Sequence, residues 1–299
     1  ELVFILTEKS IKREQWGSKL GFVLAAVGSA VGLGNLWGFA YRSSQGGGAA
    51  FVLLYILVVL VVCLPIFVAE FALGRNTSTS AFLAPIKAAG PRWAPLGWLF
   101  LIAPLAIASY YAVIMGWTAD IFIQSLFVGL PLNPEESSSL FDSIHSGKRD
   151  LIGQIFSLGL GAYIISGGIK KGIEKLNKIC IPILFIILIS LAIWAAFLTN
   201  SGDGYRNFLL NFDINQLANP TTIRNAFSQA FFSLSLGIGI MITYASYLNK
   251  KSDLPKQAIQ IASLDTIVGL MAGLITFPII FSFGLGETIS KSTIATLFI

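Results

Sequence analysis

The sequence has little of the chemistry on which enzymes and disulfide-rich proteins depend. Its 299 residues include only two cysteines, Cys63 and Cys180, and one histidine, His145. The cysteines lie in separate apolar stretches without the spacing of metal ligands, and His145 lies in a polar segment. This pattern argues against a disulfide framework and a Cys/His metal site, and it contains no catalytic cluster. We therefore do not expect an enzyme.

Charged residues are scarce too. They make up 12% of the chain, while 55% is hydrophobic and the mean hydropathy is +0.77. Soluble domains carry about 25% charged residues, so this composition indicates a protein embedded in lipid. Apolar runs of about 20 residues predict membrane-spanning helices. Seven such runs occur, at 20–40, 49–74, 96–127, 150–168, 177–198, 224–247 and 257–284. The predicted fold class is an all-α polytopic membrane protein.

The basic residues predict how these spans are oriented. If the spans alternate in direction, fourteen of the twenty Lys and Arg residues fall on one side and six on the other. The positive-inside rule assigns the richer side to the cytoplasm. We expect a multi-pass protein of the plasma or bacterial inner membrane with a cytoplasmic N-terminus. The pI near 9.2 then reflects topology and not nucleic-acid binding.

Two of the predicted spans contain residues that weaken a helix at membrane depth. Gly28–Trp37 reads GSAVGLGNLW, and Phe231–Gly239 reads FFSLSLGIG. Irregular backbone inside a membrane is tolerated only where it is packed in protein or lines a cavity. We expect a polar ligand at these breaks. The alternative is that the glycines only allow helices to pack closely.

The residues around the breaks suggest what the ligands are. Amides freed at Leu33 and Gly34 would present the positive end of a helix dipole to an anion such as a carboxylate. Carbonyls freed at Gly28, Ala30 and Val31 would offer oxygen ligands to a hard cation such as sodium. Asp265 lies in an apolar span with no Lys or Arg in the core of any span to pair with it. A bound cation is its natural partner, and a protonated Asp in a helix interface is the alternative.

Several longer motifs resemble one family. They are REQW at Arg13–Trp16, GSAVGLGN at Gly28–Asn35, GGGAAF at Gly46–Phe51, Glu70 with Gly74–Arg75, Tyr110–Tyr111, KGIEK at Lys171–Lys175, SLSLG at Ser233–Gly237 and YASY at Tyr244–Tyr247. This combination resembles the neurotransmitter:sodium symporter family. The resemblance implies a LeuT-type inverted-repeat fold with broken first and sixth helices. The chain begins without Met and ends after the seventh span, so we interpret it as an N-terminal fragment.

The resemblance also implies a domain organisation and a function. Residues 1–198 would form the first five-helix repeat, and residues 199–299 an extracellular loop and the start of the second repeat. The implied function is sodium-coupled symport of amino acids by alternating access, with sodium ions, an amino acid and the lipid bilayer as partners. No nucleic acid is expected, and the oligomeric state is left open. The alternative is a transport-inactive amino-acid binding or sensor protein on the same fold.

The site residues implied by the resemblance fall into three groups. The substrate residues are Ala30, Leu33, Gly34, Ile107, Tyr111, Phe232, Ser233, Ser235 and Ile238. The ligands of a first sodium are Ala30, Asn35, Ser233 and Asp265, and those of an incomplete second sodium site are Gly28 and Val31. The residues for gating and support are Arg13, Trp16, Glu70, Gln229 and Tyr247.

Three positions refine this interpretation. Gly32 aligns with an Asp of monoamine carriers, so glycine leaves room for an amino acid's own carboxylate. Gly38 stands where many members have the arginine of an extracellular gate. Arg42, one turn further out, would either substitute for that arginine or be a solvated loop charge, and we favour the solvated charge. Asp265 supplies a fixed negative charge where chloride-dependent members bind a halide, so we expect transport that is independent of chloride.

Overall fold

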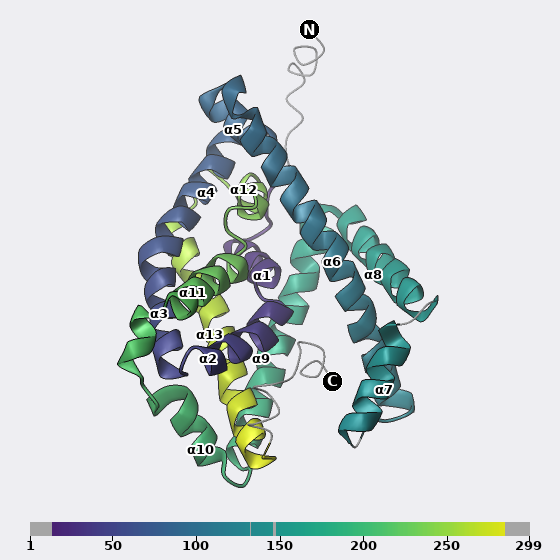
Figure 1. Ribbon diagram of the computed structural model, residues 1–299. Coiled ribbons are helices and arrows are strands. Elements are labelled where there is room, and N and C mark those ends of the chain that lie inside the picture. The colour runs from purple at the N-terminus through teal and green to yellow at the C-terminus, as the bar shows by residue number, and fades with distance from the viewer. Residues whose placement is uncertain (1–13, 132, 146–147, 285–299) are drawn as a thin grey trace.

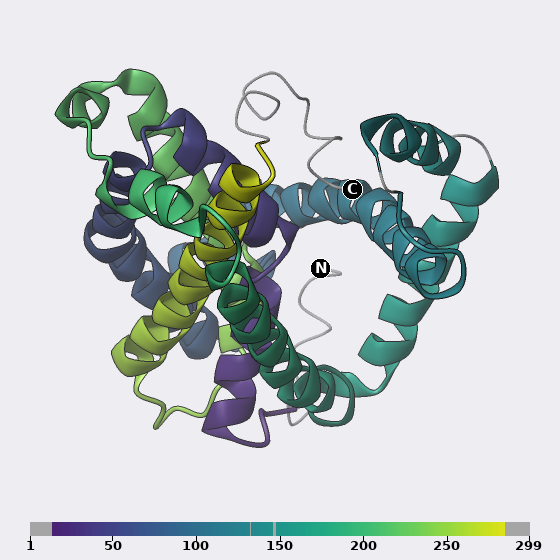
Figure 2. The ribbon, with the colours of Figure 1, turned by 90° about the horizontal axis from the view of Figure 1, so that it is seen from below.

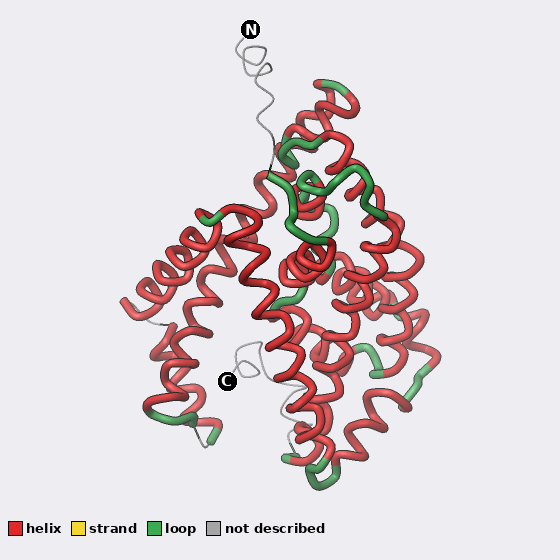
Figure 3. The backbone as a smooth tube through the Cα atoms, turned by 180° about the vertical axis from the view of Figure 1, so that it is seen from behind, coloured by secondary structure: helices red, strands yellow, loops and turns green. Residues whose placement is uncertain are grey.

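The computed structural model describes residues 14–131, 133–145 and 148–284, and helices make up nearly all of that part (Figures 1 and 3). Within these ranges the only extended pairing is an isolated bridge between Gly48 and Phe212. This confirms the all-α class. The α-helices are α1 (Lys19–Ala30), α2 (Phe39–Gln45), α3 (Ala49–Val58), α4 (Leu64–Thr77), α5 (Leu83–Ala89), α6 (Ala94–Phe127), α7 (Pro134–His145), α8 (Lys148–Ser166), α9 (Lys175–Ala196), α10 (Ser201–Tyr205), α11 (Pro220–Ser233), α12 (Ile240–Ala245) and α13 (Leu254–Ser282). Shorter π or 3₁₀ segments are η1 (Gly34–Gly38), η2 (Val59–Cys63), η3 (Pro91–Trp93), η4 (Ile169–Glu174), η5 (Arg206–Leu210) and η6 (Ile214–Ala218).

The helices account for the predicted spans. Four continuous stretches are long and apolar enough to cross a membrane: Ala49–Thr77, Pro91–Phe127, Ile169–Ala196 and Leu254–Ser282. A fifth candidate is the pair Lys19–Ala30 and Gly34–Gln45, which bends by 69° at the break. The other two predicted spans fall on α8 and on α11 with α12, which are also helical. Lipid requires each backbone polar group to find an internal partner, which explains why apolar runs of this length form helices.

Both predicted helix breaks are present. The first follows Ala30, where Val31 adopts an extended conformation with φ −73° and ψ 121°. The second separates α11 from α12, and in it Ser235 and Gly237 have positive φ values of 53° and 78°. Glycine adopts such left-handed conformations without a steric penalty, so the glycines of this motif permit the unwinding.

The arrangement of the helices brings the two breaks together. In Figure 1, α1 and α11 lie near the centre of the molecule with α13 between α9 and α3, while α5 lies at one end and α10 at the other. Helix α1 packs against α9 and α13, α11 against α3, and α12 against α4. Seen from below, α6, α7 and α8 form a group to one side of the other helices (Figure 2). The division into repeats at residue 198 stays a prediction.

Buried aromatic side chains hold the broken first helix against α3 and α4. The rings of Phe39 and Tyr55 meet edge to face with centroids 5.0 Å apart, and those of Phe22 and Phe71 do so at 5.4 Å. All four side chains are fully buried. Such pairs contribute about 0.5–1.5 kcal/mol each beyond the burial of their surface. They anchor both halves of the broken helix, one ring on each side of the break.

Two carboxylates lock the segment before α1 to the turn before α9. Glu174 accepts hydrogen bonds from the amide of Gly17 at 2.6 Å and from the hydroxyl of Ser18 at 3.0 Å. In the opposite direction, the carboxylate of Glu14 accepts hydrogen bonds from the backbone amides of Ile169 at 3.0 Å and Lys170 at 3.1 Å. These two backbone hydrogen bonds lower the pKa of Glu14 below its ordinary value. The exchange fixes where the inner half of the broken helix begins.

Candidate ion and substrate site

A buried polar cluster joins the two helix breaks to α13. Nδ2 of Asn35, just beyond the first break, donates to Oδ1 of Asp265 at 2.7 Å and to Oγ of Ser233 at 2.7 Å. The Ser233 hydroxyl, at the end of α11, donates to Oδ2 of Asp265 at 2.5 Å. Asp265 has no exposed surface, and the other two side chains are 2% exposed. We call these three residues the Asp265 cluster.

The chemistry of the Asp265 cluster suits a hard monovalent cation. Neither of the two ion pairs in the described part of the chain involves Asp265. The buried hydroxyl groups of Tyr55 and Thr266 lie beside the cluster and add two further oxygen atoms to it. Oxygen ligands with a single carboxylate favour an ion such as sodium over a transition metal. Consistently, no group of three His, Cys, Asp or Glu side chains gathers among the residues that the structure describes.

A cavity of about 270 Å³ lies on the outer side of the first break. It is bounded by the outer half of the broken helix, by α6 and by α11, and its wall consists of Leu33, Gly34, Gly38, Tyr41, Arg42, Tyr110, Tyr111, Ile114, Gln229 and Phe232. The rings of Tyr111 and Phe232 are 6.4 Å apart. A Cβ atom added to Gly34 would lie 3.0 Å from Cε1 of Phe232 and 3.9 Å from the Tyr111 hydroxyl. The backbone of the break therefore faces these two side chains directly.

Four of the predicted substrate residues line this cavity, namely Leu33, Gly34, Tyr111 and Phe232. Ala30 ends α1 beside the break, and Ser233 belongs to the Asp265 cluster. The remaining three are not part of the cavity wall. Ile107 is half-buried on α6 one turn before Tyr111, Ile238 is half-buried in the unwound segment, and Ser235 donates to the carbonyl of Ser29 at 3.4 Å.

The interpretation of Arg42 as a solvated loop charge is wrong. Arg42 is half-buried in the cavity wall, and its Nη1 donates to Oε1 of Gln229 at 2.5 Å. Nε2 of Gln229 in turn donates to the carbonyl of Gly34 at 3.1 Å. The segment around Arg42 is not a loop but helix α2, which lies along α11 and carries the guanidinium inward.

Sequence reasoning also missed Tyr41, Tyr110 and Ile114 in this wall. A signal for Ile114 and Arg42 was available. Ile114 follows Tyr111 by three residues, and Arg42 follows Gly38 by four, so each pair shares a helix face.

Glu70 supports the unwound segment from α4. Its Oε1 accepts a hydrogen bond of 2.7 Å from the amide of Gly237, and the side chain is 8% exposed. An unwound backbone leaves amides without helical partners, and a buried amide needs one. The carboxylate satisfies one of them.

The predicted inner gating residues lie together where they are described. Nε1 of Trp16 donates to the carbonyl of Tyr244 at 2.9 Å, and its backbone amide donates to the carbonyl of Tyr247 at 3.3 Å. Trp16 also packs on Phe22, with ring centroids 5.7 Å apart. Arg13 lies outside the described residues. The contacts tie the start of α1 to the end of α12.

The two residues predicted for a second ion lie at the inner side of the break. Gly28 packs against α9, where an added Cβ would overlap Oδ1 of Asn177. The amide of Val31 donates to the carbonyl of Val27 at 2.7 Å. The close approach of Asn177 gives Gly28 a packing role that is independent of any ion.

This chain is similar in sequence to a family of sodium-dependent transporters. A family model described as the sodium:neurotransmitter symporter family matches residues 13–145 and 151–295. An uncharacterized sodium-dependent transporter of Methanocaldococcus jannaschii is 41% identical over 279 residues, covering 89% of this chain and 56% of that protein. The uncharacterized sodium-dependent transporter YhdH of Bacillus subtilis is 38% identical over 277 residues, covering 91% and 61%. This chain therefore spans somewhat over half the length of these relatives.

A solved structure gives the same result for the fold. The crystal structure of MhsT in complex with L-phenylalanine matches with a TM-score of 0.84 and 37% sequence identity. The match covers 96% of this chain and 68% of that one. Nearly all of this chain thus has a structural counterpart in a protein that was crystallised with an amino acid.

Proposed function

Because this chain belongs to the sodium:neurotransmitter symporter family, we propose that it forms the ion and substrate site of a sodium-coupled amino-acid symporter. Its basic residues favour a cytoplasmic N-terminus in a cell membrane. The observation that carries the proposal is the Asp265 cluster, in which a fully buried carboxylate without a cationic partner in the described ranges meets both helix breaks. A buried charge of this kind is costly and by default marks function.

In the proposed function, sodium is a co-substrate held by oxygen atoms of the Asp265 cluster together with the carbonyl of Ala30. The two residues that donate hydrogen bonds to the Asp265 carboxylate, Asn35 and Ser233, carry oxygen atoms of their own. A cation entering the cluster would replace those hydrogen bonds with metal–oxygen contacts. Because Asp265 supplies the negative charge itself, transport would not need chloride.

The substrate's carboxylate would bind at the amides of Leu33 and Gly34 and at the Tyr111 hydroxyl. Helix starts favour anions because their amides and dipole point toward the ligand. The wall formed by Tyr110, Tyr111, Ile114 and Phe232 is largely apolar, which favours a neutral and bulky side chain. The L-phenylalanine complex of MhsT, at 37% identity, supports this class of substrate.

Alternating access would require the two ends of the site to close in turn. On the outer side, Phe232 and the Arg42–Gln229 hydrogen bond lie between the breaks and the surface. On the inner side, Trp16 and Tyr247 join α1 to the end of α12. The broken helices connect both sets of contacts to the Asp265 cluster, so binding there can shift the balance between them.

The experiment that tests the proposal compares binding and flux in the full-length protein. Amino-acid binding is titrated in sodium and in potassium at equal ionic strength, and uptake is measured in proteoliposomes with and without a sodium gradient. Coupling between ligands is typically about 1–3 kcal/mol, so we expect a several-fold or larger loss of affinity without sodium. Equal affinity in both cations would refute the ion site. Sodium-dependent binding without uptake would instead favour the alternative, a transport-inactive binding or sensor protein.

A further inference from the structure

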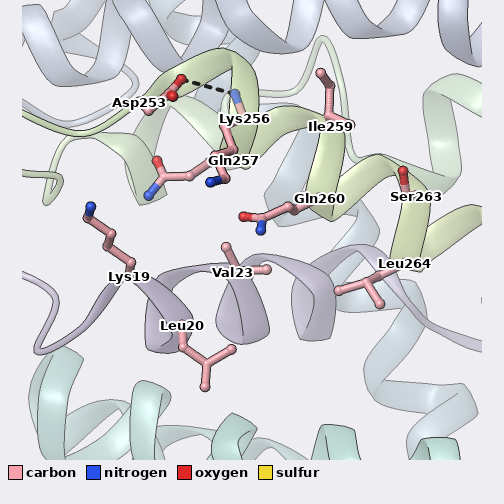
Figure 4. Close-up of a pocket in the computed structure, with 10 residues that line it drawn as sticks. All are labelled: Lys19, Leu20, Val23, Asp253, Lys256, Gln257, Ile259, Gln260, Ser263 and Leu264. Atoms are coloured by element: carbon pink, nitrogen blue, oxygen red, sulfur yellow. Dashed lines mark hydrogen bonds between the residues drawn. The ribbon is translucent and has the colours of Figure 1, made fainter.

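A second and larger hollow lies away from the substrate cavity, between α1 and the first half of α13. Its volume is about 590 Å³, and Figure 4 shows the side chains that line it. Lys19 and Leu20 come from the first residues of α1, and Lys256, Gln257 and Ile259 come from the start of α13. None of these residues belongs to the site described above. We call this hollow the α1–α13 groove.

One end of the α1–α13 groove is basic. Lys19 and Lys256 both lie there, and both are exposed. Neither takes part in the ion pairs found within the described ranges. Asp253 is the one acidic residue of the lining, and its Oδ1 accepts from the backbone amide of Lys256 at 3.2 Å (Figure 4). Two ammonium groups against one carboxylate leave this end with a net positive charge.

The rest of the α1–α13 groove combines the apolar residues Leu20, Val23, Ile259 and Leu264 with the polar residues Gln257, Gln260 and Ser263. Leu20 is 62% exposed and Ile259 is 53% exposed. Gln257 lies at the same end as Lys19 and Lys256 (Figure 4), and it is only 4% exposed. Its Oε1 is buried, and no donor reaches it from any residue that the structure describes. A buried acceptor in this state costs about 1–3 kcal/mol unless a ligand supplies a donor.

From these features we propose that the α1–α13 groove binds an anionic phospholipid. The phosphate lies between the ammonium groups of Lys19 and Lys256, a hydroxyl of the headgroup donates to Oε1 of Gln257, and an acyl chain covers Leu20 and Ile259. Phosphatidylglycerol has all three features. Basic pockets between spans on the cytoplasmic side are suited to anionic headgroups, and this end of both helices is the one that the charge distribution assigns to the cytoplasm.

The geometry favours a lipid over a free phosphate ion. Leu20 follows Lys19 on α1 and Ile259 lies one turn after Lys256 on α13, and both are exposed, so a ligand that covers only the lysines would leave these two apolar side chains uncovered. An acyl chain can cover these side chains, which a soluble phosphate ester cannot do. The inference concerns lipid and would survive a failure of the proposed transport function.

The test uses the full-length protein purified in neutral detergent and titrated with single lipids, with bound lipid counted by native mass spectrometry. Phosphatidylglycerol is compared with phosphatidylcholine in the wild type, in Lys19→Gln/Lys256→Gln and in the matched control Lys250→Gln/Lys251→Gln. The control removes the same charge from two exposed lysines in the turn before α13. We expect phosphatidylglycerol affinity to fall about 10- to 30-fold in the groove variant and to change little in the control.

A second variant tests the hydrogen bond separately. Gln257→Met keeps the side-chain volume but removes the acceptor, so it should erase the preference for phosphatidylglycerol over phosphatidylmethanol, which has the same charge and no free hydroxyl. Soluble sn-glycerol 3-phosphate should not displace the lipid. Equal loss in the groove and control variants, equal affinity for phosphatidylcholine, or displacement by the soluble phosphate would each overturn the proposal. The thermal unfolding temperature of each variant identifies any that misfolds.

Discussion

The guanidinium of Arg42 donates a 2.5 Å hydrogen bond to Oε1 of Gln229, whose own amide donates to the carbonyl of Gly34. A charge in the outer wall is thereby connected to the backbone of the first helix break. A Cβ atom at Gly38 would lie 3.7 Å from the same Gln229 oxygen. Arg42 lies one helical turn after Gly38. It donates to the same Gln229 oxygen that a longer side chain at Gly38 would contact.

This relationship predicts that Arg42 contributes to substrate binding. Arg42→Ala removes the hydrogen bond and leaves the Gln229 oxygen without its donor, and hydrogen bonds to charged groups contribute about 1.5–3 kcal/mol. We expect roughly a tenfold or larger loss of amino-acid affinity, with Arg42→Lys intermediate because one ammonium cannot reproduce the planar guanidinium. Binding titrations of the full-length protein measure this. Arg224→Ala is the control, since Arg224 is exposed on α11 and lies outside the cavity wall; equal affinities in the two variants would contradict the prediction.

A second prediction concerns the sign of the substrate's charge. The nearest atom to a Cβ added at Gly32 is Cε1 of Tyr111, 4.0 Å away, so the position has room for a side chain. Gly32→Asp places a carboxylate beside the proposed carboxylate site, and we expect it to abolish binding of zwitterionic amino acids. Gly32→Ala adds only a methyl group and should bind the substrate with an affinity close to wild type. Unaltered affinity in Gly32→Asp would show that the carboxylate binds elsewhere.

A third prediction concerns the unwound segment. Glu70→Ala leaves the amide of Gly237 without its acceptor, which should lower the free energy of unfolding by about 1–3 kcal/mol. Glu70→Gln keeps an oxygen at the same place and should cost less. Thermal unfolding of the purified full-length variants compares the two. If both variants lose the same stability, the negative charge and not the hydrogen bond to Gly237 is what matters.

The helix breaks and the buried charge could be predicted from the sequence because both cost free energy inside a membrane. Helix breaks and buried charges violate strong local rules inside a membrane, so the glycines near Gly32 and Gly237 and the carboxylate of Asp265 stood out from their apolar surroundings. The seven apolar runs likewise predicted where helices lie, because length and hydropathy determine them.

Contacts that depend on the orientation of the two halves of a broken helix could not be predicted in this way. The spacing of Gly38 and Arg42 was a local signal for a shared helix face, but the hydrogen bond to Gln229 also depends on α2 lying along α11, which no local pattern records. Ile107 and Ile238 were placed in the pocket by resemblance and stay predictions, since neither belongs to the wall of the cavity that Phe232 and Gln229 line from α11. Tertiary contacts, not propensity, decide these orientations.

The last prediction is that Asp265 determines both the affinity for sodium and the indifference to chloride. Asp265→Asn removes the buried charge but keeps one oxygen that can accept from Asn35, while its amide nitrogen can donate to the Ser233 hydroxyl, so the cluster should remain folded. A carboxylate a few Å from a cation attracts it strongly in a low-dielectric site and repels a second anion there. We expect wild-type uptake to be unchanged when chloride is exchanged for gluconate at constant sodium.

The Asp265→Asn variant should need a higher sodium concentration for half-maximal substrate binding, and chloride should partly restore its uptake activity. Wild-type uptake that collapses without chloride would refute this account, and the sodium titration of Asp265→Asn would show separately whether the carboxylate acts on the cation at all.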